Sequence, residues 1–85
     1  MKDFSTQAKL LRTAREAANI TQGELARMLG YTSPQMISNW ERELCGAPLE
    51  IMPKLCKILG LKPSELVDML TDEYRTRVKK VLRAA

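Results

Sequence analysis

The sequence predicts an all-α fold, a single small domain built from short helices. Apolar residues recur at helical spacing along almost the whole chain, and no stretch shows the sustained two-residue alternation of a strand. Helix start and stop signals succeed one another closely, with no linker, repeat or low-complexity tract between them. Because 85 residues support one core and leave no room for a second, we expect one folded unit.

The first helix is expected to begin after Ser5 or Thr6, since either hydroxyl can cap it, and to end by Asn19. It continues through the run QAKLLRTAREAA. The residues predicted to face inward are Leu10, Leu11, Ala14 and Ala18.

The second and third helices carry stronger signals. Thr21 and Glu24 occupy the N-cap and N3 positions of a capping box, and Gly30 supplies the left-handed residue that ends the second helix. Ser33 can cap the third helix, with Pro34 at its first position, where a missing N–H costs nothing. Two helices joined by a short turn form a helix-turn-helix.

A fourth helix is predicted over 49–59, closed by Gly60, with Pro53 tolerated because it lies within about a turn of the start. Start signals recur at Pro63, and the segment after this proline forms either one long helix or two helices closely joined through Thr71. Its apolar series is Leu66, Val67, Leu70, Tyr74, Val78 and Val81.

The third helix has two distinct faces when it is turned by 100° per residue. The arc expected to be buried holds Ile37, Trp40 and Glu41. The opposite arc holds Gln35, Ser38, Asn39 and Arg42. Gln and Asn can bond an adenine edge through two hydrogen bonds, and Arg can do so with guanine, so this polar row suits a helix that reads the DNA major groove. A row that simply faces water is the other interpretation.

Composition disfavours enzymes and metal proteins. The chain has no histidine and only two cysteines, Cys45 and Cys56, which cannot complete a four-ligand metal site, and we expect both to stay reduced. We predict no cofactor and no catalytic residues. No apolar run is long enough for a signal sequence or a membrane span, so we expect a cytoplasmic protein that does not bind membranes.

The net charge of +4 is unevenly distributed. Residues 74–85 hold five basic and no acidic side chains, whereas 44–73 hold three basic and five acidic ones. Lys and Arg suit the C-terminal end of a helix, where they face the negative end of its dipole. The same run is also suited to contact with phosphate or with an acidic protein.

The sequence from LRTAREAANITQGELARMLGYTSPQMISNWERE to PLEIMPKLCKILGLKPSEL resembles the λ-repressor/Cro-like (XRE-type) helix-turn-helix regulators over about residues 8–70. Many positions agree together: Arg15, Thr21, Gln22, Glu24, Leu25, Ala26, Leu29, Gly30, Ile37, Ser38, Trp40, Glu41, Leu55, Leu59 and Gly60. The resemblance implies a compact five-helix DNA-binding domain that usually acts as a dimer. Two departures are a turn between Gly30 and Ile37 that is one residue longer than is common, and Glu43 where glycine is frequent.

The resemblance also implies roles for single residues. It gives Gln22 a phosphate contact, places Gln35 and Asn39 at base-reading positions, and pairs Arg15 with Glu41 in a structural ion pair. We expect the remaining polar residues near the third helix to hold the DNA backbone or flank the site: Thr32, Ser33, Ser38 and Arg42.

The combined prediction is a sequence-specific regulator of transcription, a repressor that binds double-stranded DNA as a homodimer. We expect residues 1–70 to form the DNA-binding domain and 71–85 a basic amphipathic helix. That helix either forms the dimer interface or docks on the first helix of its own chain. The alternatives are an antitoxin or adaptor whose C-terminal helix binds a partner protein, and a non-specific nucleoid or RNA binder.

Overall fold

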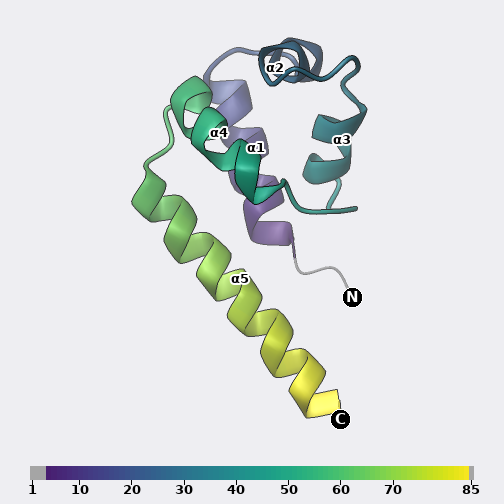
Figure 1. The fold of residues 1–85 in the computed structure, drawn as a ribbon, viewed down its shortest axis with the longest axis vertical. Coiled ribbons are helices and arrows are strands. Elements are labelled where there is room, and N and C mark those ends of the chain that lie inside the picture. The colour runs from purple at the N-terminus through teal and green to yellow at the C-terminus, as the bar shows by residue number, and fades with distance from the viewer. Residues whose placement is uncertain (1–3, 85) are drawn as a thin grey trace.

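The computed structural model describes residues 4–84 and confirms the all-α prediction (Figure 1). The described part contains α1 (Ser5–Ala17), α2 (Gln22–Met28), α3 (Gln35–Glu41), α4 (Met52–Leu59) and α5 (Pro63–Ala84). A single 3₁₀ turn, Leu49–Ile51, leads into α4. Within these residues no helix combines the length and the apolar character that a bilayer span requires.

The start of α1 differs from the prediction by about a residue. The helix begins at Ser5 itself, the N-cap is Phe4, and no side chain caps the end. Ser5 and Thr6 therefore lie inside the first turn, where their hydroxyls cannot act as the N-cap group. Of the four residues predicted to face inward, Ala18 is the exception: it is exposed, because it comes after the last helical residue and lies outside the packed face.

The helices α1 to α4 each end at a residue with a left-handed backbone. These are Asn19 (φ 60°), Gly30 (φ 89°), Glu43 (φ 64°) and Gly60 (φ 68°). After α3 the Glu43 amide donates to the Trp40 carbonyl at 3.2 Å and the Leu44 amide donates to the Asn39 carbonyl at 2.9 Å. This pair of bonds is a Schellman motif, which normally has glycine at the left-handed position. Glu43 thus takes a glycine conformation at the point where the sequence departs from the family pattern.

The start of α2 agrees with the predicted signal, whereas α3 and α4 begin one and three residues later than predicted. The capping box is present, with the Thr21 amide donating to Glu24 Oε1 at 2.9 Å and the Glu24 amide donating to Thr21 Oγ1 at 3.0 Å. Pro34 is the N-cap of α3 rather than its first residue. The predicted helix over 49–59 is divided into the 3₁₀ turn and α4, with Pro53 in the first turn of α4, where no intrahelical bond is lost.

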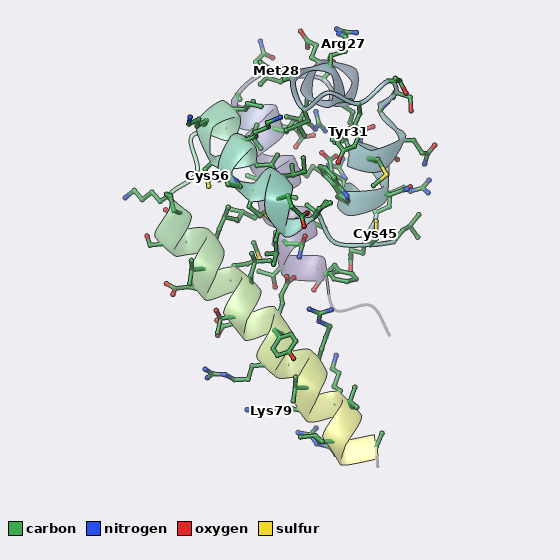
Figure 2. The ribbon with its side chains drawn as sticks, viewed as in Figure 1. Arg27, Met28, Tyr31, Cys45, Cys56 and Lys79 are labelled. Atoms are coloured by element: carbon green, nitrogen blue, oxygen red, sulfur yellow. The ribbon has the colours of Figure 1, made fainter. Side chains whose placement is uncertain are left out.

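One core joins α1 to α5. Its largest fully buried side chains are Trp40, Leu25, Ile37 and Leu55. Ala26 is also buried (1% exposed), which lets α2 and α3 pack closely. The ring of Tyr31 meets Trp40 edge-on, with centroids 5.9 Å apart, and Figure 2 shows Tyr31 lying between α2 and α3. The same figure shows Cys45 and Cys56 well apart, and both are free thiols.

The last helix is continuous through Thr71, so the alternative of two joined helices is wrong. It begins beside α4 and runs away from α2 and α3, so that its end is the part of the molecule farthest from them (Figure 1). The predicted apolar series does not share one face: Leu66 is buried, whereas Val67, Tyr74 and Val81 are 61%, 64% and 69% exposed. A repeat of 3.6 residues places Val67 about 100° from Leu66, on a different side of the helix.

A buried polar cluster fastens α5 to α1. The Gln7 side-chain amide donates to Glu73 Oε1 at 2.8 Å, and the Gln7 backbone amide donates to Glu73 Oε2 at 3.0 Å. Gln7 Oε1 in turn accepts from the Ala47 amide at 2.9 Å. Since Gln7 and Glu73 are only 3% and 6% exposed, each needs these partners, and together they hold α5 against α1 at one fixed position.

Candidate nucleic-acid interface

The outward face of α3 carries the polar row that the sequence predicted. Gln35 and Arg42 are exposed, and Ser38 and Asn39 are half-buried. Behind them Ile37 and Trp40 are each 1% exposed, which fixes the rotation of the helix about its axis. The turn before α3 adds two exposed hydroxyls, those of Thr32 and Ser33.

The two amides of the row are joined to each other. Gln35 Nε2 donates to Asn39 Oδ1 at 2.8 Å, an i to i+4 bond along the exposed side of α3. This bond uses one N–H of the Gln35 side chain. The second N–H and Oε1 of Gln35, and both N–H groups of Asn39, are available for other hydrogen bonds. The pair therefore presents a defined pattern of donors and acceptors to a molecule that approaches α3.

The start of α3 is held by its own turn. Ser33 Oγ accepts a hydrogen bond from the Gln35 backbone amide at 3.4 Å, and the Ser38 amide donates to the Pro34 carbonyl at 3.0 Å. Thr32 and Ser33 thus lie directly beside the polar row of α3, at its N-terminal end. Such a placement suits contacts to phosphates that flank the bases read by the helix.

Arg15 and Glu41 form the predicted ion pair behind this face. Arg15 Nε lies 2.6 Å from Glu41 Oε2, and Arg15 Nη2 donates to Glu41 Oε1 at 3.1 Å. The side chains are only 12% and 4% exposed. The hydrogen bond to Glu41 raises the pKa of the Arg15 guanidinium above its ordinary value, so the group stays charged. Arg15 Nη1 also donates to the Ile20 carbonyl at 2.7 Å, which ties the α1–α2 turn to the same carboxylate.

The structure gives Gln22 a contact that the sequence did not predict. Its Nε2 donates to Glu41 Oε1 at 3.0 Å, so the first residue of α2 is joined to the last residue of α3. Gln22 is half-buried, and its second N–H and its Oε1 are not used in this bond. Glu41 therefore links three helices, and it sets where Gln22 stands relative to the polar row.

Several structural residues were missed at the sequence level. Gln7 and Glu73 were not singled out, although each lies on an apolar helix face, Gln7 one turn before Leu11 and Glu73 one turn after Met69. A polar residue at an apolar position was the available signal. Arg77 was likewise missed: its guanidinium lies over the ring of Phe4 at 5.2 Å and that of Tyr74 at 5.7 Å. The contact with Phe4 joins residues distant in the sequence, and no local pattern indicates it.

Comparison with known protein families assigns this part of the chain to a helix-turn-helix family. The Helix-turn-helix family HTH_3 matches residues 11–66, about two thirds of the chain, and this range contains α2, α3 and the Arg15–Glu41 pair. The searches of the curated proteins and of the solved structures found no match. HTH_3 comprises DNA-binding domains and is not an enzyme family. The chain therefore belongs to the XRE-type, λ-repressor-like helix-turn-helix family of DNA-binding domains.

Proposed function

We propose that this protein is a sequence-specific transcriptional regulator, a cytoplasmic repressor that binds a palindromic operator in double-stranded DNA as a homodimer. The observation that carries the proposal is the exposed Gln35–Asn39 amide pair on α3, fixed outward by Ile37 and Trp40 buried behind it. Membership of a DNA-binding family supports the same assignment.

In this proposal Gln35 and Asn39 read bases. With one N–H committed to Asn39, Gln35 retains one donor and one acceptor, which matches the N7 acceptor and N6 donor of adenine. Asn39 retains two N–H donors, which match the acceptors of guanine, O6 and N7, or O4 of thymine. We therefore expect each half-site to contain an A·T pair under Gln35, next to a base that offers acceptors to Asn39.

In the proposal, the neighbouring polar groups contact the DNA backbone and do not contact the bases. Gln22 approaches phosphate with the N–H that Glu41 leaves unused, and Thr32 and Ser33 donate from the turn before α3. Ser38 and Arg42 flank the reading pair and contact the backbone beside it. Phosphate contacts supply most of the affinity of such complexes, which is consistent with a positive chain whose reading helix carries few charges.

The homodimer would place one α3 in each of two successive major grooves. Half-sites would then lie about 34 Å apart, one turn of the double helix, or a multiple of that distance. Repression is the proposed outcome because a dimer seated on an operator blocks access to the DNA it covers. The arrangement requires no ligand or cofactor.

Selection of duplexes from a random library, followed by competition binding, tests the proposal. Gln35→Ala should relax preference at one base pair per half-site, by about 1–3 kcal/mol for the lost bidentate contact. Gln22→Ala should weaken binding to all duplexes about equally. Ser64→Ala, at an exposed position at the start of α5, is the matched control. It should change neither the base preference nor the overall affinity for DNA.

Melting curves of each variant separate lost contacts from lost folding, because Gln22 also bonds Glu41. A loss of affinity for all duplexes with Gln35→Ala, together with a loss at one base pair only with Gln22→Ala, would contradict the division between base contacts and phosphate contacts. Equal binding of the native protein to every duplex would favour a non-specific coating protein.

A second candidate is an antitoxin or adaptor that holds a partner protein with α5. The observation that favours it is the exposed end of this helix, where Val81 and Leu82 are 69% and 70% exposed among basic residues. A co-purifying protein whose release requires removal of residues 74–85 would support this candidate over the regulator.

A further inference from the structure

An open groove of about 510 Å³ lies where α5 passes the start of α1 (Figure 1). Its walls come from three parts of the chain: the start of α1, the segment that follows α3, and the middle of α5. Sites for small ligands usually have volumes of about 300–1,000 Å³. The groove is separate from the candidate DNA-reading face, because none of the residues of the polar row of α3 lines it.

One charged side chain in this groove has no polar partner. Within residues 4–84 the Arg77 guanidinium makes no hydrogen bond and no ion pair, and its Nε is buried. The other buried side-chain nitrogen without a hydrogen bond in that range is Trp40 Nε1, in the core. The guanidinium lies over the rings of Phe4 and Tyr74, 5.2 and 5.7 Å from their centroids. Because buried polar atoms are nearly always paired, this group lacks an acceptor that a ligand can supply.

The Phe4 wall of the groove is fixed by a glycine. A Cβ at Gly46 would come within 2.9 Å of Phe4 Cε1, closer than real Cβ atoms pack. Only a residue without a side chain leaves room for the ring at this place. Leu49 and Leu70 add to the apolar lining. The groove therefore combines apolar walls of defined position with an unpaired guanidinium.

A second charge lines the same groove and also lacks a counter-charge. Glu73 accepts two hydrogen bonds from Gln7, and among the described residues no cation pairs with it. Glu73 and Arg77 stand four residues apart on α5, in the order that normally favours an ion pair. They do not pair, because Glu73 is directed to Gln7 and Arg77 to Phe4. A carboxylate oxygen that accepts one hydrogen bond can accept another, so both charges can bind a ligand.

We propose that this groove binds a free α-amino acid with an apolar side chain. The ligand carboxylate accepts two hydrogen bonds from the terminal nitrogens of Arg77, which are not buried. The ligand ammonium donates to Glu73. Residues four apart on a helix have Cβ atoms about 5–6 Å apart, a span that two charges on one carbon atom can bridge. The apolar side chain packs against Leu49, Leu70 and the two aromatic rings.

Charge complementarity selects this class of ligand over a simple anion or a simple cation. A carboxylate or phosphate without an ammonium pairs with Arg77 but places its charge near Glu73, which is only 6% exposed. An amine without a carboxylate pairs with Glu73 but meets the guanidinium. Like charges so placed oppose binding. A zwitterion is neutral overall and satisfies both groups of the groove.

Titration of the full chain with L-leucine, without DNA and followed by two-dimensional NMR, tests the proposal. The Gly46 and Ala47 amide signals and the Gln7 side-chain amide signals should shift in a saturable way. The expected dissociation constant is on the order of 1 mM, as is usual for a ligand of so few atoms.

Two leucine analogues separate the contributions of the two charges. Isocaproate is leucine without its ammonium group, and isoamylamine is leucine without its carboxylate. Each should bind about tenfold more weakly than L-leucine, because each loses a charge-assisted contact. The analogues test the role of Glu73 without altering its bonds to Gln7, on which the packing of α5 depends.

The matched variants are Arg77→Met and Arg75→Met. Arg77→Met keeps an apolar stem beside the rings and should weaken L-leucine binding about tenfold. It should not weaken isoamylamine binding, because that ligand has no carboxylate. Arg75 is exposed on α5 and does not line the groove, so Arg75→Met should bind all three ligands like the native protein. Melting curves show whether each variant is folded.

Three results would overturn the inference. The first is the absence of saturable shifts with L-leucine at about 20 mM, well above the expected dissociation constant. The second is equal binding of L-leucine by the native protein and by Arg77→Met. The third is binding of isocaproate or isoamylamine as tight as that of L-leucine, because the ligand would then not need both charges.

These measurements are independent of the proposed function, because they contain no DNA. Binding of L-leucine by a protein without duplex preference would contradict the proposed function alone. Sequence-specific DNA binding by a protein that does not bind L-leucine would contradict the amino-acid site alone.

Discussion

Replacement of Glu43 by glycine is expected to stabilise the protein. Glu43 has φ 64° and occupies the left-handed position of the Schellman motif that ends α3. Within the described residues its side chain makes no hydrogen bond or ion pair that the substitution would remove. The change therefore acts on the backbone conformation of the residue and leaves the packing of α3 in place.

The expected magnitude comes from two opposing terms. A residue with a Cβ pays about 1–2 kcal/mol to adopt the left-handed conformation. Glycine removes that cost but adds about 0.5–1 kcal/mol, because its unfolded chain has more conformations to lose. The net stabilisation is about 0.5–1 kcal/mol. For a chain of this size it corresponds to a rise in melting temperature of about 2–8 °C.

Thermal and urea denaturation, followed by circular dichroism, measure the effect. Glu43→Ala is the matched control: it removes the carboxylate and keeps the Cβ, so it should stay within about 0.5 kcal/mol of the native protein. Gly30→Ala tests the same argument in reverse, since Gly30 has φ 89° and nothing lies within 4 Å of the added Cβ. It should cost about 1 kcal/mol from backbone strain alone. If Glu43→Ala stabilised as much as Glu43→Gly, the charge would be the cause and the conformational argument would be refuted.

Two further predictions concern charged groups. Glu41→Leu should destabilise the fold by about 3–5 kcal/mol because it strands the buried Arg15, whereas Arg15→Met/Glu41→Leu should cost less than Glu41→Leu alone; a double-mutant cycle by urea denaturation measures this, and purely additive losses would contradict it. Hydrogen bonds with Thr21 lower the pKa of Glu24 below its ordinary value of 4.5. The charged group therefore contributes stability that is complete above about pH 4.5 and is lost as the pH falls through the folded pKa. Urea midpoints between pH 6 and 3 should fall less for Glu24→Gln than for the native protein, and parallel curves would show that Glu24 has no part in acid sensitivity.

Local signals were enough for most of the secondary structure. Two kinds of signal act within a single turn: the capping box at Thr21 and Glu24, and the glycines at 30 and 60. Because they are local, they can be recognised in the sequence. The errors were of the same local kind. They include the N-cap of α1, where Phe4 stands in place of Ser5 or Thr6, and the division of the fourth helix into a 3₁₀ turn and α4. Ends of helices fray and shift by a residue or two at small energetic cost.

The residues of the candidate site could be predicted from the sequence, because helical geometry alone places Gln35 and Asn39 on one face. The bond between their amides was not predicted, nor was the attachment of Gln22 to Glu41. The first depends on the choice of side-chain rotamers. The second depends on how closely α2 approaches the end of α3, which is a property of packing.

The sequence by itself determined the helices, the family and the polar row of α3, because periodicity, capping and residue type are properties of neighbouring positions. Only the tertiary structure decided which side of α5 is buried. The Gln7–Glu73 bonds and the Arg77–Phe4 contact join parts of the chain more than sixty residues apart, and they leave Val67, Tyr74 and Val81 exposed. Such long-range contacts result from the packing of the whole chain, and no short stretch of sequence encodes them.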